Sequence, residues 1–181
     1  MKIGTHAPTW RVPCLLNGRL TYLPLAAFQG NQLVLCCRPS LAETDAWLLD
    51  TQINRFYECG VVLAVLVQSD YAFSQTWVRS PHNFRLPFLA DPLRRLGRSL
   101  RLSRFLPSHR CETLFFDQHS RLQYRLCHDL NLRGITAVLE IAESDFCQRS
   151  NQKFPDFAVD SDLFQAQHPS LEIPMSSYTL K

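Results

Sequence analysis

Two apolar runs, residues 32–37 and 61–67, are the clearest pattern along this chain, and Gln32 at the start of the first is their one polar residue. Runs of this length without a polar side are typical of strands that are buried on both faces of a sheet. Between the runs, apolar residues recur at the spacing of a helix, which predicts an amphipathic helix with one buried face. These residues are Ala42, Ala46, Leu49, Ile53 and Phe56.

The start of this helix carries its own signal. Ser40 and Glu43 form the Ser-x-x-Glu pattern of a capping box, in which each side chain bonds a free backbone N–H near the helix start. Pro39 ends the preceding strand, and Gly60 follows the last apolar position of the helix. The sequence therefore predicts a strand, a capped helix and a second strand in immediate succession.

Before and after this unit the pattern is shorter but readable. Asn17-Gly18 is a hairpin signal between the apolar segments 12–16 and 20–23. Ser69 or Asp70 could cap a further helix that continues to Val78. The N-terminus therefore predicts a β-hairpin, and the second buried strand leads into another helix.

The second half of the chain predicts a short strand, a helix, a hairpin and a last helix. Residues 86–89 read as a short extended segment, and Asp91-Pro92 reads as a cap and first residue of a helix. Residues 113–116 and 122–126 flank the turn 117–120, and residues 135–142 read as a helix. The apolar stripe of the helix after Pro92 is Leu93, Leu96 and Leu100.

This order of elements predicts an α/β domain in which helices flank a mixed central β-sheet, with an N-terminal β-hairpin. The domain is expected to span residues 1–143. From Ser144 onward the periodicity dissolves into Gln, Asp, Ser and Pro with scattered Phe residues, which predicts a weakly structured C-terminal tail over residues 144–181.

Composition adds few constraints. Hydrophobic residues make up 46% of the chain, which is enough for a core, and the net charge of +3 does not require a polyanionic partner. Six arginines lie in the stretch from Arg94 to Arg110, which contains no acidic residue and is typical of a solvated helix face. A surface that binds an acidic protein or a nucleic acid is the less favoured interpretation. No membrane-spanning run or signal-peptide pattern occurs, so we expect a cytoplasmic protein.

Seven cysteines occur, and none of them forms a CxxC pair. In a reducing compartment such residues are mostly free thiols that pack in the core. No pair of His or Cys residues has the spacing of a zinc site. The sequence therefore predicts neither a metal ion nor another cofactor.

Several short phrases carry a family resemblance. Residues 4–10 are similar to G-x-x-A-P-x-F, residues 86–92 to L-x-F-P-L-L-S-D-P, and residues 113–117 to x-F-I-I-D. In this order, over residues 3–143, the phrases resemble the peroxiredoxin family, the AhpC/TSA branch of the thioredoxin fold. The resemblance implies a thioredoxin-like fold, thiol-dependent peroxide reduction, a thioredoxin-type reductant and a homodimer.

The resemblance places the reactive motif of the family, P-x-x-x-T/S-x-x-C, on the stretch that begins at Pro39. Counting from Pro39 puts Glu43 at the Thr position, which holds the peroxide, and Ala46 at the Cys position, which attacks it. A methyl group cannot act as a nucleophile, and a nearby carboxylate raises the pKa of a thiol. The resemblance therefore implies a divergent member that lacks the peroxidatic cysteine motif.

Two other cysteines are candidates for a displaced site. Cys111 follows His109 and Arg110, which could stabilise a thiolate, and Arg110 adjoins the position of the family's arginine. Cys36 and Cys37 point to opposite faces of their strand, and Cys37 is closer to the helix start. Core packing remains the competing interpretation for each thiol.

Two hypotheses about function follow from these residues. The first is a redox-responsive or binding module without ordinary peroxidase turnover. The alternative is a thiol-dependent antioxidant oxidoreductase that reduces peroxide with Cys111 or Cys37, with Arg110 as the group that stabilises the thiolate.

Overall fold

The structure is a computed structural model, which describes residues 2–16, 18–68 and 84–146. The strands are β1 (Arg11–Leu16), β2 (Arg19–Pro24), β3 (Gln32–Arg38), β4 (Val61–Val67), β5 (Phe88–Ala90), β6 (Arg110–Phe116) and β7 (Leu122–Asp129). The helices are η1 (Leu25–Phe28), α1 (Glu43–Glu58), α3 (Arg95–Ser99) and α4 (Leu132–Phe146). The strands form one sheet in the order β2-β1-β5-β4-β3-β6-β7.

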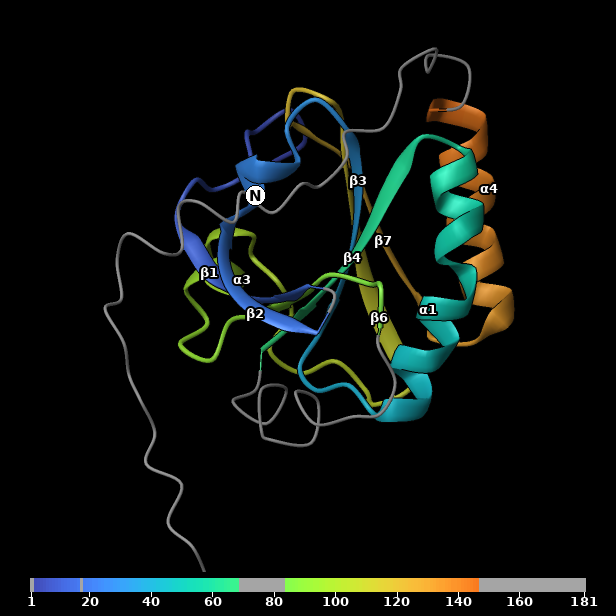
Figure 1. The fold of residues 1–181 in the computed structure, drawn as a ribbon, viewed down its shortest axis with the longest axis horizontal. Coiled ribbons are helices and arrows are strands. Elements are labelled where there is room, and N and C mark those ends of the chain that lie inside the picture. The colour runs from blue at the N-terminus through green and yellow to red at the C-terminus, as the bar shows by residue number, and fades with distance from the viewer. Residues whose placement is uncertain (1, 17, 69–83, 147–181) are drawn as a thin grey trace, which may run out of the picture.

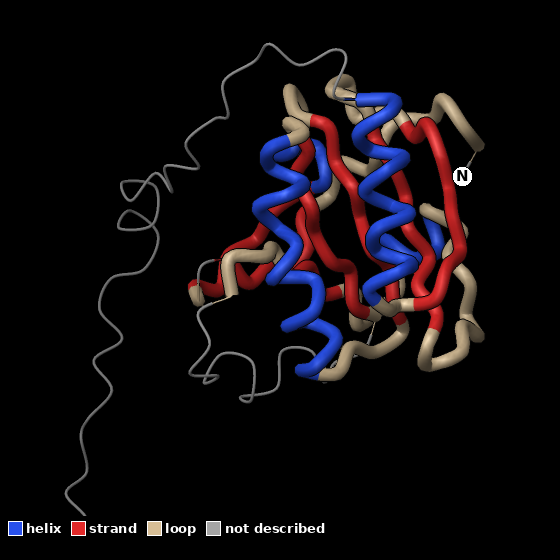
Figure 2. The backbone as a smooth tube through the Cα atoms, turned by 90° about the vertical axis from the view of Figure 1, so that its right-hand side faces the viewer, coloured by secondary structure: helices blue, strands red, loops and turns tan. Residues whose placement is uncertain are grey.

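The sheet separates two layers (Figure 1). Helices α1 and α4 lie side by side across one face, as Figure 2 shows, while α3 lies on the other face. In the centre, β3 pairs in parallel with β4 and antiparallel with β6. The predicted mixed sheet with flanking helices and an N-terminal hairpin is therefore confirmed.

The two central strands are buried along their whole length, as their apolar sequences predict. Alternate residues of β3 enter different cores: Val34 and Cys36 pack beneath α1 and α4, whereas Leu35 and Cys37 pack beneath α3. This alternation is the strand geometry that places successive side chains on opposite faces. The two neighbouring cysteines of β3 therefore belong to different environments.

The predicted capping box at the start of α1 is wrong. The N-cap is Ala42, it makes no side-chain cap hydrogen bond, and Glu43 is the first helical residue. The Ser40 carbonyl accepts a hydrogen bond from Arg38 instead, and Leu41 packs against the core beneath α1. These contacts keep Ser40 outside the helix, so α1 begins later than predicted.

The helix predicted from Asp91-Pro92 also begins later. The Asp91 N–H bonds the Val67 carbonyl, which continues the pairing of β5 with β4, and α3 starts only at Arg95. Oδ2 of Asp91 accepts a hydrogen bond from the N–H of Gly97 at 2.6 Å. Because the first turn of the predicted helix is absent, Leu93 is 65% exposed instead of buried.

The C-terminal hairpin and last helix are confirmed and are longer than predicted. Strand β6 begins at Arg110, β7 ends at Asp129, and α4 runs to Phe146, beyond the predicted domain boundary at residue 143. Asn17, the predicted helix between Ser69 and Val78, and residues 147–181 of the predicted tail lie outside the described residues. The division into a domain and a tail stays a prediction.

Candidate functional site

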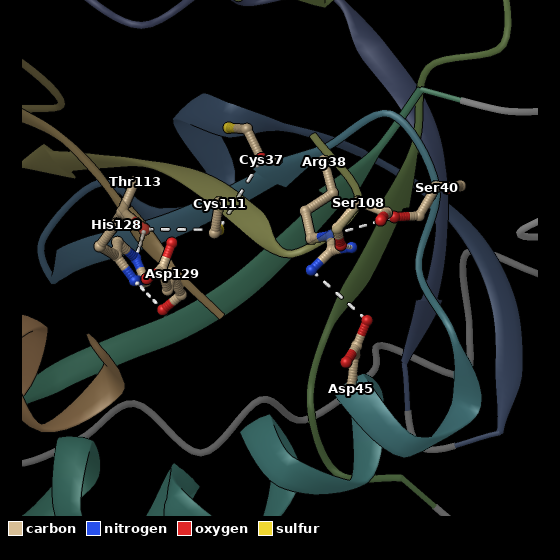
Figure 3. Close-up of polar contacts among 9 residues, drawn as sticks. All are labelled: Cys37, Arg38, Ser40, Asp45, Ser108, Cys111, Thr113, His128 and Asp129. Atoms are coloured by element: carbon tan, nitrogen blue, oxygen red, sulfur yellow. Dashed lines mark hydrogen bonds and ion pairs between the residues drawn. The ribbon is translucent and has the colours of Figure 1, made fainter. Parts of the chain in front are cut away.

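A buried arginine, Arg38, lies where β3 ends and the chain turns toward α1 (Figure 3). Its Nε donates to the Ser40 carbonyl at 3.1 Å, and its Nη2 donates to the Ser108 carbonyl. Its Nη1 lies 3.4 Å from Oδ2 of Asp45, in the first turn of α1. The side chain of Arg38 is 4% exposed and that of Asp45 is 25% exposed. A largely buried ion pair therefore occupies the N-terminus of α1.

The two positions that the resemblance links to catalysis lie beside this pair. Ala46 is fully buried in the first turns of α1, and its N–H bonds the Ala42 carbonyl at 3.1 Å. Glu43 is exposed, and with Asp45 it lies in the first turn of the helix. Acidic side chains there stabilise the positive end of the helix dipole. Two carboxylates therefore lie at the positive end of α1.

Four polar side chains cluster on the sheet face that α1 and α4 cover: Cys36, Cys111, Thr113 and His128. Oγ1 of Thr113 lies 3.5 Å from Sγ of Cys36, 3.6 Å from Sγ of Cys111 and 2.8 Å from Nε2 of His128. Strand pairing brings them together, because Cys36 lies opposite Thr113 and Cys111 lies opposite His128. None is more than 8% exposed.

The hydrogen bonds of this cluster have a defined direction. Nδ1 of His128 lies 2.9 Å from the carbonyl oxygen of Asp129, which can only accept, so Nδ1 carries a proton. In the neutral ring Nε2 is then an acceptor, and the Thr113 hydroxyl donates to it. The oxygen of Thr113 is left to accept from a thiol. A chain of hydrogen bonds thus connects a buried thiol through Thr113 to His128 (Figure 3).

The thiols of the two β-strands are poor acids. A hydrogen bond with Cys36 and burial raise the pKa of Cys111 well above its usual value, although His128 acts to lower it. Burial, together with the charges of Cys111 and Glu112, raises the pKa of Cys37. Burial lowers the pKa of His128, but its interactions with Cys111 and with Asp129 leave that pKa raised. Both candidate thiols are therefore protonated near neutral pH.

The structure does not bring the three predicted site residues together. Sγ of Cys37 faces the other core and donates to the Leu35 carbonyl at 3.5 Å, while Sγ of Cys111 lies 3.8 Å from the carbonyl oxygen of Cys37. Arg110 neighbours Cys111 in β6 and so points to the opposite face. Nε of Arg110 lies 3.5 Å from Oδ1 of Asp129, and its side chain is 45% exposed.

Sequence reasoning missed the partners that Cys111 does have, Thr113 and His128, and it missed the pairing of Arg38 with Asp45. The sequence did hold a signal for Thr113: it lies two residues after Cys111 in the same strand, and residues two apart in a strand point to the same face. A basic residue at the end of an otherwise apolar strand was a signal for Arg38. The position of His128 depends on the strand register, which the sequence did not reveal.

The structure describes six of the seven cysteines; no disulfide joins any two of these six, and of these Cys127 is the exposed one. Within residues 2–16, 18–68 and 84–146, no group of three or more His, Cys, Asp or Glu side chains is placed to hold a metal ion. In the same part of the chain, no helix combines the length and the apolar character needed to cross a membrane.

No protein-family model and no curated protein matches this sequence. Solved structures do match it. The mitochondrial 2-Cys peroxiredoxin from Plasmodium falciparum superposes with a TM-score of 0.67 at 15% identity, covering 85% of this chain and 100% of that chain. Mycobacterium tuberculosis AhpC gives 0.63 at 16% identity, covering 80% and 92%. Xanthomonas campestris peroxiredoxin Q gives 0.60 at 15% identity, covering 79% and 98%. The chain therefore has the peroxiredoxin-like form of the thioredoxin fold, as predicted.

Proposed function

We propose that this chain is a peroxiredoxin-like protein without ordinary peroxidase turnover, which acts as a redox-responsive or binding module. One observation carries the proposal: the N-terminus of α1 holds the Arg38–Asp45 ion pair, and Ala46 lies behind it. A helix N-terminus and a guanidinium are the groups that lower the pKa of a reactive thiol. Here both face the Asp45 carboxylate.

The displaced thiols support the same conclusion. A thiol whose pKa lies at 9 or above is roughly 1% or less thiolate at pH 7, and the thiolate is the nucleophile. Cys111 and Cys37 both have raised pKa values and are at most 1% exposed. Each therefore lacks both the charge state and the access to solvent that peroxide chemistry requires.

The alternative function, thiol-dependent reduction of peroxide by Cys111, is favoured by the hydrogen-bond chain through Thr113. In this chemistry the Cys111 proton passes to Thr113 while the Thr113 proton passes to Nε2 of His128. The thiolate then attacks one peroxide oxygen, the O–O bond breaks, a sulfenic acid forms, and the leaving hydroxide takes the proton from His128. A thioredoxin-type thiol reductant would restore Cys111. Arg110 would have to leave Asp129 to join this site.

Mass-tagging of sulfenic acids on the reduced full chain after addition of hydrogen peroxide separates the two functions. The proposal expects Cys111 and Cys37 to oxidise no faster than Cys127, whose exposure makes it the reference thiol. Cys127→Ser is the matched control, because it removes that reference without touching the buried cluster. Oxidation of Cys111 ahead of Cys127, abolished in Cys111→Ser and slowed in Thr113→Val, would establish the alternative.

The proposal includes a homodimer in the cytoplasm. Support for self-association comes from Trp47, which is 48% exposed on α1 beside a hollow of about 630 Å³ that Leu48 and Thr51 also line. Sedimentation of the wild-type chain and of Trp47→Glu tests this part directly. A dimer that the substitution dissociates supports it, whereas a wild-type monomer contradicts it.

A further inference from the structure

A second hollow, of about 570 Å³, lies between the start of β1 and the segment that leads into α3. Its lining includes two exposed apolar side chains, Trp10 at 47% and Leu93 at 65% exposure. Three arginines, Arg11, Arg95 and Arg98, complete this part of the lining. Exposed apolar groups gathered in a concave surface are typical of an interaction site. The arginines indicate that its occupant carries negative charge.

The positive charge of this hollow is not neutralised within the described ranges. All three arginines are exposed, and none makes an ion pair with a residue there; Nη2 of Arg98 donates to the Leu93 carbonyl at 3.3 Å. Asp91 also lines the hollow, but it is 3% exposed and its Oδ2 already accepts the Gly97 N–H. The accessible surface is therefore cationic and apolar.

The chain itself contains a segment of complementary chemistry. Residues 154–164, with the sequence FPDFAVDSDLF, include Asp156, Asp160 and Asp162 and no basic residue. The same segment holds three Phe residues together with Val and Leu. Alternation of carboxylates with large apolar side chains matches a surface on which arginines surround a Trp and a Leu. The hollow and residues 154–164 thus carry charges of opposite sign, and both present apolar side chains.

The segment can reach the hollow. Helix α4 ends at Phe146 on the face opposite α3 (Figure 1), so the connecting chain must pass the thickness of the sheet. A sheet and its facing layer are about 10 Å apart, so two such spacings separate α4 from α3, and with the five steps from β7 to β1, about 24 Å, the path is about 44 Å. When extended, the thirteen residues 147–159 span roughly 43–47 Å. The centre of the acidic segment is therefore within range of Trp10.

We propose that residues 154–164 dock in this hollow of their own chain. The Asp side chains of the segment pair with Arg11, Arg95 and Arg98, and its Phe side chains cover Trp10 and Leu93. Docking removes the exposed apolar surface from water, which is favourable by about 25 cal/mol per Å² of apolar area. The inference is independent of the proposed function, because it involves none of the thiols.

The test places a photo-reactive p-benzoylphenylalanine at position 93 of the full chain, followed by illumination and peptide mass spectrometry. We expect crosslinks from position 93 to residues 154–164 in protein of monomer mass. The same probe at Leu132, which is 56% exposed at the start of α4, is the control and should not label the segment.

A charge variant makes the test specific. Asp156→Lys, Asp160→Lys and Asp162→Lys together should lower the crosslink yield roughly tenfold, since each lost surface ion pair contributes about 0.5 kcal/mol. Glu172→Lys, in the tail but outside the segment, is the matched control and should leave the yield unchanged. Crosslinks found only between two chains, no crosslink to residues 154–164, or an unchanged yield in the triple variant would each overturn the proposal.

Discussion

Replacing Gly134 with alanine should destabilise the protein, although alanine is the better helix former. Gly134 lies in the first turn of α4, against the end of β7. A Cβ at this position would lie 2.0 Å from the carbonyl oxygen of Asp129 and 2.8 Å from Nδ1 of His128. The nearer atom belongs to the backbone, so it cannot move aside by a change of rotamer.

The size of the effect follows from three contributions. Helix propensity favours alanine by about 1 kcal/mol. Forcing an extra carbon into a packed site costs about 1–3 kcal/mol. Displacing the Asp129 carbonyl also weakens its hydrogen bond from Nδ1 of His128, which contributes about 1 kcal/mol. We therefore expect Gly134→Ala to lower the free energy of unfolding by about 1–3 kcal/mol.

Urea denaturation followed by circular dichroism measures this difference. Gly97→Ala is the matched control, because Gly97 is also helical and its added Cβ would meet the nearest atom, Oδ2 of Asp91, only at 3.4 Å. We expect that variant to be as stable as the wild type or up to about 1 kcal/mol more stable, because alanine is the better helix former. If Gly134→Ala were as stable as Gly97→Ala, the close approach of α4 to β7 would be wrong.

Three further predictions concern the site. Asp45→Asn leaves the Arg38 guanidinium without its counter-charge and should cost about 2 kcal/mol in urea denaturation; an unchanged midpoint would refute a stabilising ion pair. The pKa of His128 is raised in the folded state, so the stability advantage of the wild type over His128→Gln should be complete below pH 6.5. This advantage should shrink as pH rises through the folded pKa of His128, and an advantage that grows with pH would contradict the prediction. Iodoacetamide should label Cys127 before Cys111 in the native protein, since Cys127 is exposed, and equal rates by mass spectrometry would show that Cys111 is accessible.

The central sheet could be predicted from the sequence because its pattern of apolar residues fits one arrangement of strands and helix. Apart from Gln32 at one end, the runs 32–37 and 61–67 contain no polar residue, so only strands covered on both faces bury them. The helical stripe between them requires a crossover onto one face of the sheet. The same alternation predicted that Cys36 and Cys37 face different layers. Parts of the fold that depend on periodicity alone could therefore be derived.

The site could not be derived in this way because it depends on register. Phe116 pairs with Leu122, and continuing that pairing along the hairpin would set Cys127 opposite Cys111. An irregularity between Phe115 and Phe116 shifts the register, so that His128 faces Cys111 instead. A one-residue slip moves every side chain to the other face. No local signal in the sequence marked this shift.

Helix starts failed for a related reason. Ser40 and Asp91 both have the residue type of a cap, but longer-range bonds compete for the backbone around them. Arg38 holds the Ser40 carbonyl, and β4 holds the Asp91 N–H. Capping propensity contributes about 1 kcal/mol, which such tertiary contacts readily exceed. Glu43 therefore does not take part in the predicted capping box, although it does lie in the first turn of α1.

The most direct test of the account is the ionisation of Cys111 in the folded protein. The ¹³Cβ chemical shift of labelled cysteine, followed by NMR against pH and assigned with Cys111→Ser, reports the thiolate directly. We expect no titration of Cys111 up to pH 9, because its hydrogen bond with Cys36 and its burial hold its pKa above that value. A midpoint below about pH 7.5, the upper limit for activated cysteines, would contradict the claim that this site has lost its peroxide chemistry.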